Sequence, residues 1–174
     1  MSATPNHSLS NQELLAHIPC ALLADLMLNR QWMLTTAESC TGGMIAAACT
    51  DLAGSSAWFE RGFVTYSNEA KSDMLGVPVA LISAHGAVSE PVARAMASGA
   101  LQHSRAQVAL SVTGIAGPSG GSPDKPVGTV WFGWATPDGV WSDVQRFDGD
   151  RAAVRQATLE HSLSRLIDLL TPAP

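Results

Sequence analysis

Ser39 occupies a position where a serine hydroxyl can act as a nucleophile. It follows a short apolar run at residues 32–34 and precedes a glycine pair, Gly42 and Gly43, which opens a helix-like run at 44–52. A strand-to-helix turn of this kind presents small side chains and free backbone N–H groups at the positive end of a helix. Acyl transfer needs such groups, because they stabilise the developing oxyanion. Serine is also a leading N-cap residue, and its position alone favours that simpler role.

Lys71 is the best candidate for a base that activates Ser39, since no histidine lies in a segment that resembles a triad partner. A lysine deprotonates serine only when desolvation or neighbouring donors make its ammonium form less favourable. Tyr66, the only tyrosine in the chain, precedes Lys71 at the end of an expected strand and either relays a proton or orients the lysine. The structural alternative is an exposed helical lysine and a half-buried strand tyrosine.

Cys40 is a rival nucleophile, because a cysteine near a helix N-terminus can have a lowered pKa. It is the direct neighbour of Ser39, and the two adjacent side chains point in different directions, so only one can face the site. A small buried core thiol is the simpler interpretation.

Several further residues are candidates for binding the substrate. Glu38 either caps backbone groups of the turn or is solvated, and Thr113 with Gly114 follows an expected strand, where it offers a hydroxyl and N–H groups. Arg151 and Arg155 either bind a phosphate near a helix start or belong to a cap and a surface face. The full set of substrate-binding candidates is Glu38, Cys40, Thr41, Gly42, Gly43, Thr113, Gly114, Arg151 and Arg155.

Composition narrows the class of protein. The 174 residues fit one domain, with 46% apolar and 14% charged residues, so we expect a well-packed and folded chain. A net charge of −5, without clustered Lys or Arg, argues against a nucleic-acid-binding surface. The three cysteines and five histidines show no metal-ligand spacing, so we predict no metal site and reduced cysteines in the cytoplasm. No apolar stretch approaches the roughly 20 residues that a membrane span requires.

The elements that must position these residues follow from hydrophobic periodicity and turn signals. Helices alternate with strands in the first half, and a Pro137-Asp138-Gly139 hairpin closes the second, which indicates an α/β domain with helices on both faces of a mixed sheet. Strand ends near Thr36, Tyr66 and Thr113 should then gather at one edge. The expected helices are 11–28, 44–52, a short one carrying Lys71, 89–104 and 150–170, and the expected strands are 32–36, 61–66, 107–112, 127–135 and 140–147. We leave the segment around Leu81 unassigned and expect an irregular loop at 119–127.

Five ordered motifs together resemble the CinA C-terminal domain family, whose stand-alone members are nicotinamide-nucleotide amidases. The motifs are AESCTGG at 37–43, YSNEAK at 66–71, GAVSE at 86–90, TGIAGP at 113–118 and KPVGTV at 125–130. The resemblance spans about residues 11–170, nearly the whole chain. We therefore expect a flexible segment at 1–10, one amidase domain at 11–170 and a frayed tail at 171–174.

The resemblance implies a three-layer α/β/α domain, usually a homodimer, that hydrolyses nicotinamide mononucleotide to nicotinate mononucleotide and ammonia in pyridine-nucleotide recycling. It places the family's serine, lysine and tyrosine at Ser39, Lys71 and Tyr66, and its Thr-Gly pair at Thr113 and Gly114. Our own hypothesis for the reaction needs no cofactor. Two other functions stay open, namely a non-catalytic nucleotide- or partner-binding module and an amidase for another carboxamide. The implied partner is a small nucleotide substrate, with no nucleic acid and no membrane.

Overall fold

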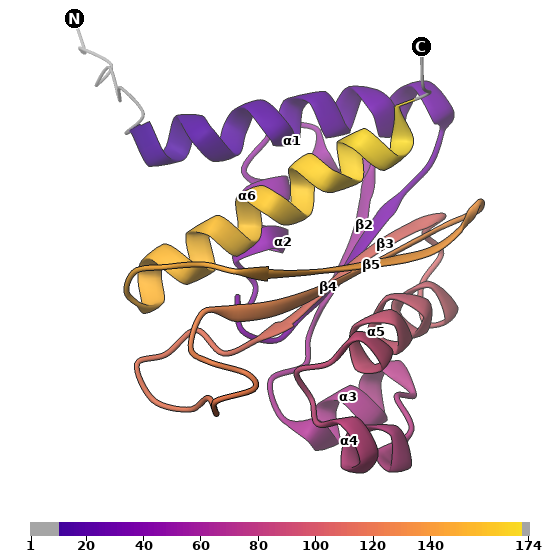
Figure 1. Cartoon of the computed structure of the whole chain (residues 1–174). Helices are drawn as coiled ribbons and strands as arrows, with labels where there is room; N and C mark the ends of the chain where they lie inside the picture. Colours follow the sequence, from indigo (N-terminus) through magenta and orange to yellow (C-terminus); the bar gives the residue numbers. More distant parts are fainter. Residues whose placement is uncertain (1–10, 172–174) are drawn as a thin grey trace, which may run out of the picture.

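A five-stranded mixed sheet forms the centre of the protein, with helices on both of its faces (Figure 1). The computed structural model describes residues 11–171, with side chains from residue 19 onward. The flexible segment expected at 1–10 and the last three residues of the tail expected at 171–174 lie outside this description. The strands are β1 (Leu34–Glu38), β2 (Phe59–Val64), β3 (Val108–Gly114), β4 (Thr129–Thr136) and β5 (Gly139–Arg146). The helices are α1 (Asn11–Arg30), α2 (Met44–Thr50), α3 (Asn68–Leu75), α4 (Val79–His85), α5 (Glu90–Gln102) and α6 (Arg151–Leu170), with a short 3₁₀ turn at Ser55–Ala57.

The strand order is β2-β1-β3-β4-β5, with β1 parallel to both β2 and β3 and the last two pairings antiparallel. All five residues of β1 are buried, as expected for a central strand that helices cover on both faces. Glu38, the last residue of β1, is in register with Val64 of β2 and Val112 of β3. The predicted gathering of strand ends at one edge is therefore confirmed.

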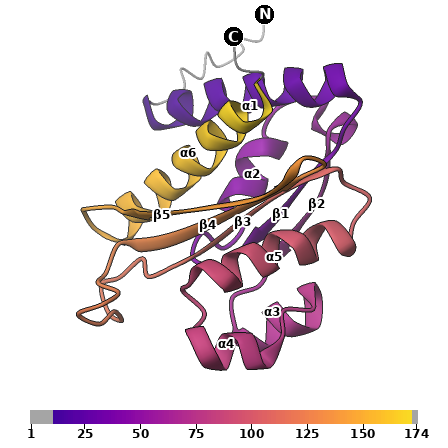
Figure 2. The same ribbon diagram turned by 45° about the vertical axis from the view of Figure 1, so that its right-hand side comes forward.

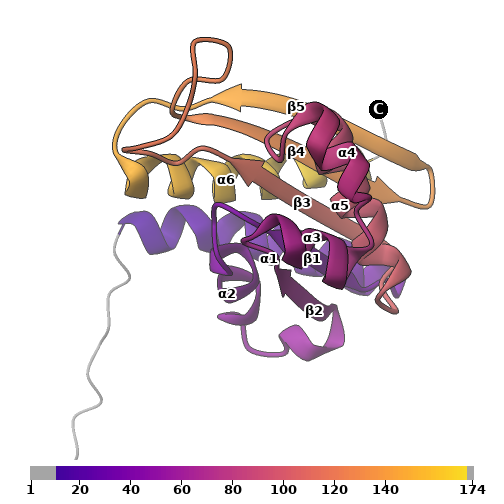
Figure 3. The same ribbon diagram turned by 90° about the horizontal axis from the view of Figure 1, so that it is seen from below.

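Three layers are visible when the molecule is turned, with α1, α2 and α6 on one face of the sheet and α3, α4 and α5 on the other (Figure 2). One apolar cluster, which includes Leu23, Phe132 and Leu163, fills the first interface. A second, which includes Phe63, Leu75 and Met96, fills the other. The view from below shows α3, α4 and α5 lying over the sheet (Figure 3). The predicted α/β/α class is confirmed.

Four of the elements expected from the sequence need correction. The unassigned segment around Leu81 is the helix α4, which is too short, at 7 residues, for a helical period to stand out. The third strand does not end at Val112 but continues through Thr113 and Gly114, because both pair with β4. The first two strands are also displaced by two residues, to 34–38 and 59–64, since an apolar run defines a strand without fixing its ends.

Candidate active site

Glu38 organises the turn that carries Ser39. Its carboxylate, only 1% exposed, accepts hydrogen bonds from Thr41 Oγ1 at 2.7 Å and from the amides of Gly43, Ile45 and Ala46 at 2.8–3.0 Å. These amides belong to the start of α2, where backbone donors otherwise have no partner inside the helix. Of the two roles considered for Glu38, the structure therefore selects the cap. Its carboxylate binds the turn, and Glu38 is not among the described residues that line the adjoining cavity.

Gly42 and Gly43 give the turn its shape. Their φ angles of 62° and 100° lie in the left-handed region that glycine adopts without strain. The N–H of Gly42 donates to Ser39 O and that of Gly43 to Glu38. These two N–H groups, which the sequence offered for an oxyanion, are thus already bonded within the turn.

Lys71 and Ser39 meet in the folded chain. Lys71 Nζ lies 3.0 Å from Ser39 Oγ and donates to the carbonyl of Thr65 at 2.9 Å, with the carbonyls of Tyr66 and Ser67 at 3.5 Å. Ser67 caps α3 by accepting from the amide of Ala70, which fixes the helix start that places Lys71 toward Ser39. Lys71 is only 1% exposed, which excludes the solvated alternative for this lysine.

Burial lowers the pKa of Lys71 below its usual value, because a desolvated ammonium is less favourable than a neutral amine. A neutral amine has two N–H donors and one lone pair. The carbonyl of Thr65 and a neighbouring carbonyl can accept the two N–H groups, which directs the lone pair toward the hydroxyl of Ser39. The arrangement therefore suits a lysine that accepts the proton of Ser39.

Cys40 is poorly suited to act as the nucleophile. It is 6% exposed, and burial raises the pKa of its thiol to about 11. A thiol with that pKa is almost entirely protonated near neutral pH, and thiolate is the nucleophilic form. The buried-thiol interpretation of Cys40 is confirmed.

The Tyr66 side chain contacts Arg151. Tyr66 is 60% exposed, its hydroxyl accepts a hydrogen bond from Arg151 Nη2 at 2.9 Å, and only its main-chain carbonyl approaches Lys71. The phenol lines the same cavity as Ser39 and Lys71. Tyr66 therefore stands at the cavity mouth, linked to α6.

Thr113 and Gly114 line the same cavity from the end of β3. The hydroxyl of Thr113 donates to the carbonyl of Ala87 at 2.9 Å, so it holds the opposing wall. A Cβ at Gly114 would lie 2.7 Å from Val130 Cγ2, which explains why a glycine is needed where β4 passes. The cavity measures about 200 Å³. The cavity is also lined by four residues that the sequence did not single out as site residues, although all four lie in the motifs that carry the family resemblance: Asn68, Ala87, Val88 and Ala116. Their side chains are small or neutral, so they gave no chemical signal of their own.

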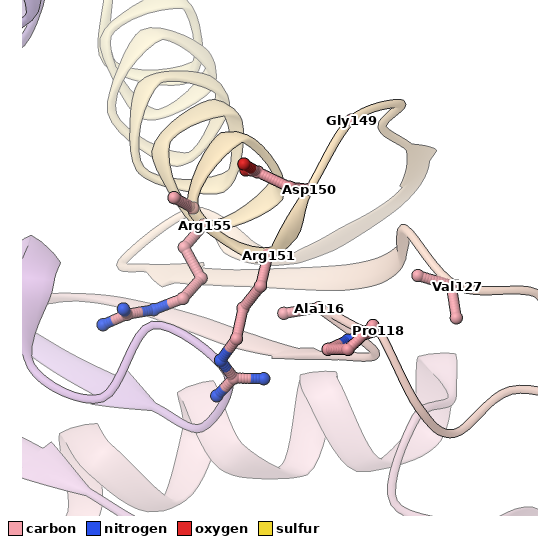
Figure 4. Close-up of a pocket in the computed structure, with 8 residues that line it drawn as sticks. Ala116, Pro118, Val127, Gly149, Asp150, Arg151 and Arg155 are labelled. Atoms are coloured by element: carbon pink, nitrogen blue, oxygen red, sulfur yellow. The ribbon is translucent and has the colours of Figure 1, made fainter.

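A second cavity of about 440 Å³ adjoins the first, and Ala116 and Arg151 line both. Figure 4 shows Arg151 and Arg155 extending from the start of α6, with Asp150 directed elsewhere. Arg151 Nη1 donates to Gly117 O at 3.0 Å, and Arg155 Nη2 donates to Thr41 O at 2.7 Å, so Arg155 also supports the turn of Ser39. The Arg155 Nε is buried without a partner in the described part of the chain. The two predicted arginines thus share a cavity beside the Ser39 site.

Among the side chains that the structure describes, at residues 19–171, no cluster of His, Cys, Asp and Glu could hold a metal ion. No helix within residues 11–171 is both long and apolar enough to cross a membrane.

Comparison with known proteins gives a consistent family assignment. The model of the CinA C-terminal domain matches residues 19–170. The nicotinamide-nucleotide amidohydrolase PncC of Shigella flexneri is 59% identical over 135 residues, which cover 76% of this chain and 81% of that protein. Its counterpart from Enterobacter agglomerans is 57% identical over 87% of this chain and 90% of its own length.

Solved structures show the same fold. The crystal structure of the competence/damage inducible protein CihA from Agrobacterium tumefaciens has a TM-score of 0.85 and 46% identity, covering 98% of this chain and 100% of that one. A competence damage-inducible protein A from Klebsiella pneumoniae has a TM-score of 0.86 and 39% identity over 89% of this chain and 96% of its own.

Proposed function

Because the chain belongs to the CinA C-terminal domain family, we propose that it is a nicotinamide-nucleotide amidohydrolase with Ser39 as its nucleophile. The observation that carries this proposal is the 3.0 Å contact between Lys71 Nζ and Ser39 Oγ at a cavity that is open to a small molecule. The relatives named as nicotinamide-nucleotide amidohydrolases support the substrate class. The bond cleaved is the C–N bond of the carboxamide group attached to the pyridine ring, which is a linear amide.

The first step joins Ser39 to the substrate. Neutral Lys71 takes the proton of Ser39, and Ser39 Oγ attacks the carboxamide carbon to give a tetrahedral oxyanion. Since the N–H groups of Gly42 and Gly43 are bonded elsewhere, we assign the oxyanion to the N–H groups of Cys40 and Thr41. Each such donor is worth about 3 kcal/mol in comparable sites.

The second step releases ammonia and then acid. Protonated Lys71 gives its proton to the leaving nitrogen, either directly or by way of Tyr66 at the cavity mouth, so that the C–N bond breaks and Lys71 is neutral again. Lys71 then activates a water molecule, which attacks the acyl carbon and frees Ser39 and the carboxylate product. The overall change consumes one water and yields nicotinate mononucleotide and ammonia, with no cofactor.

The substrate phosphate requires a separate anchor. We assign it to the larger cavity, which Arg151 and Arg155 line and where their guanidinium charges favour an anion. Arg151 lines both cavities, so a nucleotide can reach from one to the other. We also propose that the protein is a homodimer, an inference from the family resemblance.

Measuring ammonia and nicotinate mononucleotide together tests the function. Wild type should form both in equal amounts from nicotinamide mononucleotide, and Ser39→Ala should lower kcat by about 10³-fold or more. Activity that survives in Ser39→Ala would overturn the mechanism. An inactive wild type that still binds the nucleotide would favour the non-catalytic module, and preference for another carboxamide would change the substrate.

A further inference from the structure

Two sequence motifs, GAVSE at 86–90 and KPVGTV at 125–130, take no direct part in the proposed chemistry, yet the fold brings them together. Lys125, in the loop between β3 and β4, donates from Nζ to the carbonyl of His85 at 2.8 Å. His85 is the last residue of α4, and an added Cβ at Gly86 would lie 3.4 Å from the same Nζ. A lysine near the end of a helix stabilises its last carbonyls, which have no partner inside the helix. Lys125 therefore holds the turn that joins α4 to α5.

That turn forms one wall of the smaller cavity, through Ala87 and Val88. Three hydrogen bonds fix it: Lys125 to His85 O, Ser89 Oγ to Gly86 O at 2.8 Å, and Thr113 Oγ1 to Ala87 O at 2.9 Å. Thr113 anchors the wall to the sheet and Lys125 anchors it to the loop. The wall is thus held at both ends by side chains from outside the turn.

The loop is built to present Lys125 in one place. Ser122 and Lys125 exchange main-chain hydrogen bonds, with N···O distances of 2.9 and 3.2 Å, and the Ser122 hydroxyl accepts from the Lys125 amide. The loop base is closed by Ile115 N to Thr129 O and Gly128 N to Ile115 O. An ordered turn on a closed base limits how far the ammonium can move.

We propose that Lys125 is a positioning residue for the amidase, which acts by holding the Ala87–Val88 wall against the pyridine ring of the substrate. This inference rests on the proposed function. The wall contacts the ring equally in the ground state and the transition state, so losing the bond from Lys125 should raise KM more than it lowers kcat. The competing explanation is that the Lys125 charge merely attracts an anionic substrate.

Three variants separate these explanations. Lys125→Met removes the ammonium group and keeps an apolar side chain, whereas Lys125→Arg keeps a charged donor. Arg165→Met is the control, because it removes one positive charge at an exposed position on α6, away from the loop of Lys125. Lys125→Met should raise KM about three- to tenfold, the range for a partly exposed hydrogen bond from a charged group. The KM of Lys125→Arg should stay close to that of wild type, and the KM of Arg165→Met should equal it.

The choice of substrate and salt gives the decisive comparison. If Lys125 positions the wall, the KM increase in Lys125→Met persists with phosphate-free nicotinamide riboside and at high salt, where long-range attraction is screened. An increase that is confined to the nucleotide and disappears at high salt would overturn the proposal. An unchanged KM for both substrates would overturn it too.

Hydrogen exchange supplies a readout that does not depend on catalysis. Amides of residues 86–89 should exchange faster in Lys125→Met than in wild type or Arg165→Met, while the melting temperature changes little. If wild type proves inactive, the proposed function fails, but faster exchange at 86–89 would still support the contact. Unaltered exchange in an active enzyme would refute the positioning role alone.

Discussion

The Nζ atom of Lys71 lies 3.0 Å from the Oγ atom of Ser39, although the residues are 32 positions apart in the chain. Ser39 follows β1 and Lys71 lies in the helix that follows β2, its parallel neighbour. Parallel strands end at the same edge of a sheet, so the turns that follow them meet there. The order of the strands thus places a lysine base next to Ser39, which a serine needs in order to be deprotonated.

The activity should depend on the protonation of Lys71. Only the neutral amine accepts the proton of Ser39, and burial lowers the pKa of Lys71 below 10.5. We therefore expect kcat/KM to rise with pH and to level off above the pKa of Lys71 in the folded protein. Steady-state kinetics from acid to alkaline pH will check this. A profile without an acid limb would contradict a lysine base.

The pH dependence of the free energy of unfolding should reveal the lowered pKa of Lys71 without any measurement of activity. Between the pKa of Lys71 in the folded protein and 10.5, the unfolded chain binds more protons than the folded one, so the free energy of unfolding rises with pH. Lys71→Met should lose this part of the slope. Urea unfolding of both proteins over a pH series measures it, and identical slopes would show that the pKa of Lys71 is not lowered.

Replacing Cys40 should leave the chemistry in place. Because burial raises the pKa of this thiol to about 11, it supplies almost no thiolate near neutral pH. We expect Cys40→Ala to keep kcat within a factor of about 10, against the loss of about 10³-fold expected for Ser39→Ala. Ammonia release measures both. A comparable loss in the two variants would reinstate Cys40 as a nucleophile candidate.

Glu38→Gln should destabilise the protein, since the amide cannot accept as many hydrogen bonds as the buried carboxylate does now. Four donors within 3.0 Å point to this carboxylate. We expect the free energy of unfolding to fall by about 2–4 kcal/mol. Glu69→Gln, at an exposed site on α3, is the matched control and should change it by less than about 0.5 kcal/mol. Equal effects in chemical denaturation would argue against the capping role.

Replacing Arg151 or Arg155 should raise KM more for a nucleotide substrate than for a nucleoside substrate. Arg151→Met is expected to raise KM for nicotinamide mononucleotide about tenfold, the scale of one lost charge-assisted hydrogen bond. KM for nicotinamide riboside, which has no phosphate, should change much less. Arg155→Met should show the same preference with an added loss of kcat, because Arg155 also holds Thr41 O. If KM for the nucleotide is unchanged in Arg151→Met, the phosphate anchor lies elsewhere.

The α/β class, the strand-to-helix turn at Ser39, the short helix that carries Lys71 and the family all follow from the sequence. These features depend on periodicity and on residue types that lie close together in the chain. The sequence left α4 unassigned and could not choose between a capping and a solvated Glu38. A helix as short as α4 has too few turns for a hydrophobic period to be recognised. The role of Glu38 depends on the contacts of one side chain, which a periodic pattern does not reveal.

Which distant groups meet depends on the three-dimensional fold. The bonds from Lys71 to Ser39, Arg155 to Thr41, Arg151 to Tyr66 and Lys125 to His85 span 32, 114, 85 and 40 positions. Each depends on strand order and on the path of a loop, which local propensity does not encode. The burial that lowers the pKa of Lys71 and raises that of Cys40 likewise exists only once the helices cover the sheet.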